Sequence, residues 1–217
     1  MIRLAVFDCD GTLIDGQASI CAAMEQAFAQ FALPLPHRND VRRAVGLSLP
    51  QAIRTLLPEA EIEQHLALTE AYKRAFRAAR QSGELQQPLF AGIAPLLADL
   101  RKAGWLLGVA TGMSRRGLDH CLATHGLTGH FITLQTADDH PSKPHPAMLE
   151  AALAEAGIDP RDAVMIGDTV FDMHMAEAAG VRGIGVEWGY HAPHELIAAG
   201  AASIAANPAQ LGEILGL

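Results

Sequence analysis

The amino-acid sequence predicts an α/β protein with a three-layer core, in which helices cover both faces of a parallel sheet, and with an all-helical domain inserted near the N-terminus. Two observations predict this fold. Short apolar runs alternate with helical stretches over most of the chain, which is typical of a parallel sheet. A long stretch, residues 16–88, interrupts this alternation with helix after helix and contains no convincing strand.

The predicted strands are short apolar runs rich in β-forming residues, as expected for strands buried on both faces. They cover residues 4–7, 105–110, 131–134, 163–166 and 183–186. Helices are predicted between them at 96–102, 115–125, 146–156 and 171–179. A glycine follows within two residues of the end of each helix, which is typical of a left-handed helix C-terminus.

The interrupting stretch contains four predicted helices, at residues 18–31, 39–45, 50–57 and 61–81. We therefore expect two domains. Residues 1–15 and 89–217 form the α/β core domain, and residues 16–88 form a helical cap domain.

Composition limits the classes of partner. The 217 residues include 16 Lys and Arg against 24 Asp and Glu, a formal charge of −8, and half of them are hydrophobic. Non-specific binding to nucleic acid or to an anionic membrane needs a basic surface, so neither is expected. The three cysteines form no Cys-x-x-Cys pair, and no apolar run approaches the roughly 18 to 20 residues of a membrane span. These features predict a cytoplasmic protein.

The first polar cluster is Asp8-Cys9-Asp10-Gly11-Thr12, directly after the first predicted strand. Two carboxylates at positions i and i+2 past a strand end can converge on one metal ion and one substrate, and Gly11 allows a sharp turn. The alternative is that Asp8 and Asp10 only cap a turn, which is a common role of aspartate.

Three further clusters follow later predicted strands or loops. Thr111-Gly112 offers a hydroxyl and a backbone amide before a helix, Lys143 lies in a proline-flanked turn, and Gly167-Asp168 is followed by Asp172. The carboxyl ends of parallel strands share one edge of the sheet, where ligands bind. Each cluster also has an ordinary structural explanation, as a helix cap for Thr111 and Asp168 or a solvated lysine for Lys143.

In this order the four clusters resemble those of the haloacid dehalogenase superfamily, over nearly the whole chain. Lys143-Pro144-His145-Pro146 and Gly167-Asp168-Thr169 resemble its phosphoglycolate-phosphatase-like branch, and Gly46-Leu47-Ser48-Leu49 resembles the specificity loop of a type 1 helical cap. The resemblance implies a Rossmann-like core. Two departures stand out: Gly16, where Ser is frequent, and Gly112, where Asn is common.

The resemblance also implies a mechanism. Asp8 would attack phosphorus and form an aspartyl-phosphate, while Asp10 would act as acid and then as base. Mg²⁺ would be held by Asp8, the Asp10 backbone carbonyl and Asp168. Lys143, Thr111 and Gly112 would bind the phosphate group. Gly46 and Ser48, in the cap domain, would determine which substrate binds. Asp172 would position Lys143.

We therefore predict a magnesium-dependent phosphatase acting on a small phosphorylated metabolite, with 2-phosphoglycolate the leading candidate. A phosphosugar mutase or an inorganic pyrophosphatase of the same superfamily remains open, as does a monomer or a homodimer. A receiver-type signalling module is the alternative from another class. Arg42, Arg43 and Arg54 are possible anion contacts in the cap, although a solvated helix face also explains them. His191 and His194 are expected in a surface loop.

Overall fold

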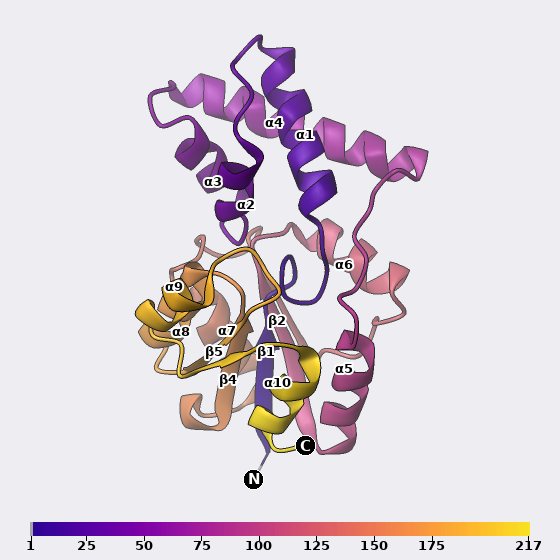
Figure 1. Ribbon diagram of the computed structural model, residues 1–217, viewed down its shortest axis with the longest axis vertical. Coiled ribbons are helices and arrows are strands. Elements are labelled where there is room, and N and C mark those ends of the chain that lie inside the picture. The colour runs from indigo at the N-terminus through magenta and orange to yellow at the C-terminus, as the bar shows by residue number, and fades with distance from the viewer. Residues whose placement is uncertain (1) are drawn as a thin grey trace.

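The computed structural model, which describes residues 2–217, has a helical layer above an α/β layer (Figure 1). The α/β layer contains a six-stranded sheet in the order β3-β2-β1-β4-β5-β6, and every neighbouring pair is parallel. The strands are β1 (Arg3–Phe7), β2 (Trp105–Thr111), β3 (Thr133–Thr136), β4 (Ala163–Gly167), β5 (Arg182–Val186) and β6 (Ser203–Ala205). The first strand of the chain is therefore central, with β2 and β4 on either side.

Helices cover both faces of the sheet, which confirms the predicted fold class. They are α5 (Ile93–Lys102), α6 (Arg115–Thr124), α7 (Ala147–Ala156), α8 (Val170–Ala178), α9 (Pro193–Ala198) and α10 (Pro208–Leu215). Alternate side chains of β1 point to opposite faces. Ala5 and Phe7 pack in the cluster that contains α5, α6 and α10, whereas Leu4 and Val6 pack in the one that contains α7 and α8. Both faces are buried, which explains the uninterrupted apolar run of this strand.

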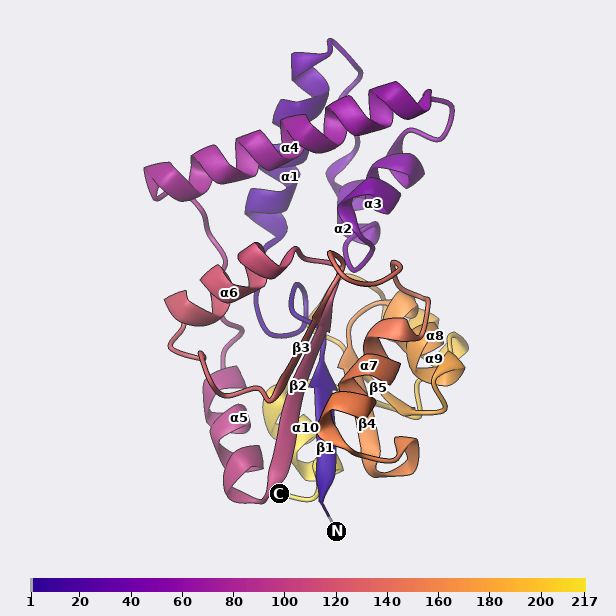
Figure 2. The ribbon, with the colours of Figure 1, turned by 180° about the vertical axis from the view of Figure 1, so that it is seen from behind.

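The upper layer consists of α1 (Gln17–Gln30), α2 (Arg38–Arg43), α3 (Leu49–Leu56) and α4 (Ile62–Ser82). These helices have an apolar cluster of their own, with Phe28, Ile53 and Leu68 almost fully buried. The C-terminal half of α4 extends over α6 (Figure 2). That residues 16–88 act as a separate domain stays a prediction.

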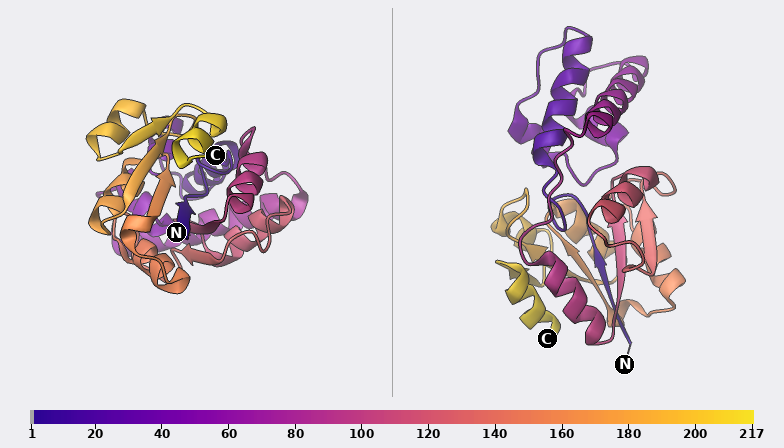
Figure 3. Two further views of the ribbon diagram at one scale, coloured as in Figure 1. Left: turned by 90° about the horizontal axis from the view of Figure 1, so that it is seen from below. Right: turned by 90° about the vertical axis from the view of Figure 1, so that its right-hand side faces the viewer.

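Two chain segments join the layers and run side by side (Figure 3, right). The Asp15 backbone amide donates to the Pro88 carbonyl at 2.8 Å, and the Phe90 amide donates to the Leu13 carbonyl at 3.0 Å. Both segments are therefore tied together next to the loop that follows β1.

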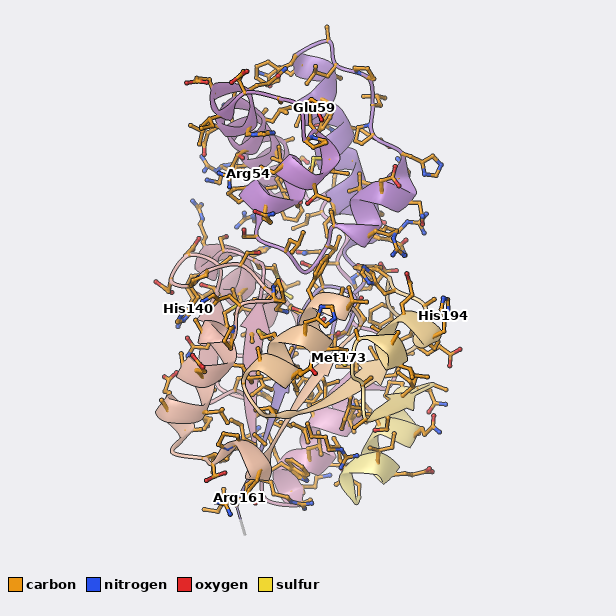
Figure 4. All side chains as sticks on the ribbon, turned by 90° about the vertical axis from the view of Figure 1, so that its left-hand side faces the viewer. Arg54, Glu59, His140, Arg161, Met173 and His194 are labelled. Atoms are coloured by element: carbon orange, nitrogen blue, oxygen red, sulfur yellow. The ribbon has the colours of Figure 1, made fainter. Side chains whose placement is uncertain are left out.

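The C-terminal region contains three elements that the sequence analysis did not predict, α9, β6 and α10. The edge strand β6 is only three residues long and lies in an alanine-rich stretch with little β propensity. Pro193 begins α9 at a first-turn position, where proline is well tolerated. The prediction that His191 lies at the surface was wrong. His191 is buried, and its Nδ1 accepts a hydrogen bond from the Val170 amide at 3.3 Å. His194 is exposed on α9 (Figure 4).

Two further features complete the fold. The strand predicted at 131–134 begins two residues later, at Thr133, and Phe131 packs in the core from the preceding loop. Within residues 2–217, no helix combines the length and the apolar character that crossing a membrane requires.

The packing of α5 in the core gives a first prediction. Leu97 on α5 is fully buried, so Leu97→Ala should lower the free energy of unfolding by about 2–5 kcal/mol through lost apolar contact and an unfilled cavity. Urea unfolding followed by circular dichroism measures this change. Leu35→Ala, at a side chain that is 57% exposed, is the control and should change stability by less than about 0.5 kcal/mol. Equal effects of the two substitutions would contradict the assigned core.

Candidate active site

The carboxyl ends of the three central strands bring the predicted residues to one edge of the sheet. Asp8 follows β1, Thr111 ends β2, and Asp168 follows β4. The Asp8 backbone amide continues the ladder by donating to the Ile166 carbonyl at 2.8 Å. Asp8, Thr111 and Asp168 are at most 1% exposed, so their polar groups lie in a protein interior.

Lys143 lies between two of the acids. Its Nζ is 2.7 Å from Asp8 Oδ1 and 2.7 Å from Asp172 Oδ1, and all three side chains are buried. Burial alone would lower the pKa of Lys143, but Asp172 and Asp8 outweigh it and raise that pKa above its ordinary value. The lysine is therefore a fixed ammonium and not a solvated loop residue.

Asp172 is held by the start of α8. Its Oδ2 accepts hydrogen bonds from the Thr169 amide at 3.0 Å and from the Thr169 hydroxyl at 2.7 Å. The Asp172 amide donates in return to Thr169 Oγ1 at 3.4 Å, which completes a capping box. A side chain at Gly167 would collide with this carboxylate. One oxygen caps the helix and the other contacts Lys143, so Asp172 orients the lysine.

Asp168 is also held by its surroundings. The Thr12 hydroxyl donates to its Oδ1 at 2.8 Å, and the Tyr190 amide donates to its Oδ2 at 3.0 Å. Gly11 has a positive φ of 88°, and a Cβ there or at Gly189 would collide with the carboxylate. Two loops therefore approach Asp168 at distances that only glycine permits.

The carboxylate oxygens of this edge are incompletely satisfied. Among residues 2–217, no hydrogen-bond donor reaches either Asp8 oxygen with good geometry, although Lys143 forms an ion pair with Oδ1, and none reaches Asp10 Oδ1. Burial raises the pKa of Asp8 to about 6, with Asp172 adding to the rise and Lys143 opposing it. Burial and the Asp8 charge raise the pKa of Asp10 to about 7. One lysine does not neutralise this group of acids.

The site has the chemistry of a cation site. Carboxylate oxygens of Asp8, Asp168 and Asp172 lie within 4.8 Å of one another. Burial, Asp8 and Asp172 raise the pKa of Asp168 well above its usual range. Asp172 is engaged by Lys143 and Thr169, and Asp168 by Thr12 and Tyr190, whereas Asp8 Oδ2 has no hydrogen-bond partner among residues 2–217. Oxygen donors of this kind suit a hard divalent cation.

The loop between α2 and α3 closes over this edge. The Ser48 amide donates to the Ser142 hydroxyl at 2.8 Å, and Gly46 packs against the Thr169 side chain. A Cβ at Gly112 would collide with the Leu47 carbonyl oxygen and lie 2.8 Å from the Gly46 carbonyl oxygen. The absence of a side chain at Gly112 therefore allows the cap loop to contact the end of β2.

A cavity of about 490 Å³ lies between the two layers. The structure places six predicted residues in its wall, namely Asp8, Asp10, Gly46, Ser48, Thr111 and Gly112. Lys143, Asp168 and Asp172 are not part of this wall; they contact Asp8 or lie behind it. The predicted site is thus divided into a surface facing the cavity and a buried charge cluster.

The cap arginines considered from the sequence do not line the cavity. Arg43 instead forms a two-point ion pair with Glu195, at 2.7 and 3.2 Å, and so joins the two layers. Arg42 donates to the Arg38 carbonyl at 3.4 Å, and Arg54 lies in the upper helical layer, away from His140 and Met173 of the lower layer (Figure 4). The arginines that do line the cavity, Arg77, Arg80 and Arg116, were not predicted.

The sequence offered only weak evidence that Arg77 and Arg80 would line the cavity. Arg80 comes three residues after Arg77 and four residues after Phe76 on α4, so its side chain lies next to both on the helix surface. The sequence does not say which face of this helix is turned toward the core.

Comparison with known proteins identifies the family. Residues 5–186 match the family described as haloacid dehalogenase-like hydrolase, which is most of the chain. The chain belongs to this family. The match begins before Asp8 and ends after Asp168 and Asp172, so it spans the whole charge cluster.

Individual relatives show which branch of the haloacid dehalogenase-like hydrolases the chain resembles. The chain is 35% identical over 204 residues to "Probable phosphatase IndB" of Dickeya dadantii, covering 92% of this chain and 87% of that protein. It is 32% identical to "Tyrosine-protein kinase PtkA" of Mycobacterium tuberculosis, covering 87% of this chain but 63% of that longer protein. It is 27% identical to "Phosphoglycolate phosphatase" of Vibrio vulnificus, covering 99% and 96%. The chain therefore resembles the phosphoglycolate-phosphatase-like branch of the family.

The raised pKa of Asp10 predicts a pH-dependent stability in metal-free protein. In the folded state this pKa is about 7, against 3.8 ordinarily, so the folded state retains a proton that the unfolded state loses as pH rises. As the pH rises from about 4 to 7, the free energy of unfolding of the wild type should therefore fall relative to that of Asp10→Asn. The fall should be at most about 1.4 kcal/mol per pH unit. Chemical unfolding in chelator measures the difference. Asp99→Asn, on the surface of α5, controls for loss of a carboxylate; a flat difference for Asp10→Asn would contradict the prediction.

The contact at Gly112 gives a third prediction. Gly112→Ala should push the backbone of the cap loop away from β2, because the obstructing atoms are backbone oxygens that cannot rotate aside. Amide hydrogen exchange of residues 44–48 should become faster, since the bond from Ser48 to Ser142 is lost. Gly117→Ala on α6, where the nearest atoms are the Ser114 hydroxyl at 3.3 Å and the Met113 methyl at 3.4 Å, is the matched control. Unchanged exchange in Gly112→Ala would show that the loop tolerates a side chain.

Proposed function

We propose that this chain is a magnesium-dependent phosphatase that hydrolyses a small phosphate monoester through an aspartyl-phosphate on Asp8. One observation carries the proposal: Asp8 faces the cavity with a carboxylate that is buried, incompletely hydrogen-bonded and beside a fixed lysine. Relatives named as phosphatases, over nearly the full length of the chain, support the reaction class.

Asp8 acts as the nucleophile in the first step. A bond forms between its free carboxylate oxygen and phosphorus, and the bond between phosphorus and the ester oxygen breaks. Asp10 gives its proton to the departing alcohol oxygen. A pKa of about 7 allows this acid to hold a proton near neutral pH, as a general acid requires.

Asp10 reverses its role in the second step. As a carboxylate it removes a proton from a water molecule whose oxygen attacks phosphorus, and the bond between phosphorus and Asp8 breaks. Inorganic phosphate leaves, Asp8 is restored as a carboxylate, and Asp10 has regained its proton.

The phosphoryl oxygens are held by positively polarised groups around Asp8. Lys143 supplies a full charge on one side, oriented by Asp172 at 2.7 Å. The Thr111 hydroxyl and the Gly112 amide supply donors at the end of β2, with the hydroxyl oriented by accepting from the Met113 amide at 3.2 Å. Gly46 and Ser48 close the site from above.

Mg²⁺ would be held by the carboxylates of Asp8 and Asp168 and by the backbone carbonyl of Asp10. The undonated oxygens of Asp8 and the crowding of buried acids support a divalent cation here. When bound, the ion offsets the repulsion between a carboxylate nucleophile and a phosphate dianion.

The alternatives differ in what receives the phosphoryl group. A phosphosugar mutase would also use Asp10, and a pyrophosphatase would use the same nucleophile on a different leaving group. A receiver-type module is disfavoured for two reasons. In a receiver the phosphorylated Asp follows a strand in the middle of the sequence, and no helical segment is inserted after the first strand. The kinase name of one relative belongs to a longer protein.

The proposal predicts the effect of removing the nucleophile. Asp8→Asn should lower phosphate release from a generic phosphate monoester with Mg²⁺ by roughly a thousandfold or more. Rapid acid quenching with ³²P-labelled ester should trap protein-bound label in the wild type but not in the variant. Chelator should abolish release, and re-added Mg²⁺ should restore it. Asp99→Asn is the control, and full activity in Asp8→Asn would exclude the mechanism.

A further inference from the structure

The cavity above Asp8 is large for a two-carbon ester. Its volume of about 490 Å³ is within the range of roughly 300–1,000 Å³ that accommodates drug-sized ligands. A substrate such as 2-phosphoglycolate has only a methylene group and a carboxylate beyond its phosphate. Such a molecule would leave most of this space without a partner.

The part of the cavity wall formed by the upper layer is mainly apolar. Ile20 and Met24 contribute from α1, Val41 and Val45 from α2 and the residues after it, and Phe76 from α4. Phe76 is stacked on Tyr72, another wall residue, with ring centroids 5.7 Å apart and planes inclined by 21°. A flat, rigid aromatic surface of this kind suits an apolar body, whereas a short charged chain would gain nothing from it.

Three arginines line the α6 side of the same cavity. Arg77 and Arg80 are on α4, Arg116 is on α6, and none of the three forms an ion pair within residues 2–217. Arg80 Nε is buried and has no acceptor in that part of the chain. Burial, followed by the charges of Arg116 and Arg77, lowers the pKa of Arg80, so this guanidinium lies near two other positive charges. An anionic group would offset these charges.

Asp138 also lines the cavity, but it does not neutralise the arginines. Its Oδ2 accepts from the Arg115 backbone amide at 2.8 Å, which fixes it at the start of α6. The cavity therefore combines an apolar wall with a cationic side, in addition to the phosphate seat at Asp8.

We propose that the substrate is a phosphate monoester of an alcohol with a ring-sized apolar body and a further acidic group, and not 2-phosphoglycolate. This inference rests on the proposed phosphatase function. The phosphate lies against Asp8, the apolar body lies against Tyr72 and Phe76, and the second acidic group meets Arg77, Arg80 and Arg116.

Matched esters test the apolar body. Benzyl phosphate and ethyl phosphate leave as alkoxides of similar basicity, so their comparison reports binding more than intrinsic reactivity. In the wild type with Mg²⁺, kcat/KM should be roughly tenfold or more higher for benzyl phosphate than for ethyl phosphate or 2-phosphoglycolate. Equal or reversed values would overturn the inference.

Variants locate the effect. Phe76→Ala should lower kcat/KM for benzyl phosphate by roughly tenfold and leave ethyl phosphate nearly unchanged, because only the larger body contacts this ring. Phe76→Trp, which fills the cavity, should also penalise only benzyl phosphate and covers the case in which the alanine variant is unstable. Phe31→Ala, at a ring that does not line the cavity, is the control. Equal losses for both esters would contradict the assigned contact.

The acidic group is tested with 4-carboxybenzyl phosphate. Its kcat/KM should exceed that of benzyl phosphate by roughly fivefold to tenfold, and Arg77→Gln with Arg116→Gln should remove the advantage. Arg74→Gln is the matched control, since Arg74 is one turn before Arg77 on α4 and does not line the cavity. No advantage of the carboxylate, or the same advantage in the double variant, would overturn this part of the inference.

A binding measurement separates this inference from the proposed function. If no ester releases phosphate, the phosphatase proposal fails; if all esters release it equally, only the inference fails. Benzylphosphonate and ethylphosphonate cannot be hydrolysed in the same way, so calorimetry with Mg²⁺ tests the cavity without turnover. Tighter binding of benzylphosphonate, weakened by Phe76→Ala, supports the inference, and equal binding contradicts it.

Discussion

The ion pairs of Lys143 with Asp8 and Asp172 are the interaction on which the rest of the site depends. A buried ammonium between two buried carboxylates is stable only if each partner is held in place, because removing one partner leaves an unpaired charge in a low-dielectric interior. The capping box at Thr169 fixes Asp172, and the central strand of the sheet fixes Asp8. Backbone elements of the core, and not the flexibility of the lysine, therefore determine where the charge lies.

Glycine residues allow these buried aspartate side chains to pack closely against the backbone. At Gly11, Gly167 and Gly189 a Cβ would overlap a carboxylate, so the loops approach Asp168 and Asp172 as bare backbone. Gly112 serves the same purpose for the cap loop. The space that a side chain at Gly112 would need is occupied by the backbone carbonyl oxygens of Leu47 and Gly46.

The sequence predicted the α/β class and the positions of most strands along the chain, because apolar runs and glycine-terminated helices follow from local chemistry. It also predicted that Asp8, Thr111 and Asp168 converge, since parallel strands end at a common edge. It did not predict β6, whose three residues have weak propensity, or the burial of His191, which depends on contacts with Val170 and the distant Arg43 carbonyl. The partner of Arg43 and the cationic side of the cavity were missed because the packing of the helical layer decides which helix face meets the core.

The paired segments that join the layers have a mechanical consequence. Gly16 ends the first segment as the N-cap of α1, and a Cβ at this residue would collide with Asp10 Oδ1. The N-cap of α1 is therefore in van der Waals contact with the Asp10 carboxyl group. Because burial is the main cause of the raised pKa of Asp10, the packing of Gly16 against this carboxyl group links the position of α1 to the acidity of Asp10.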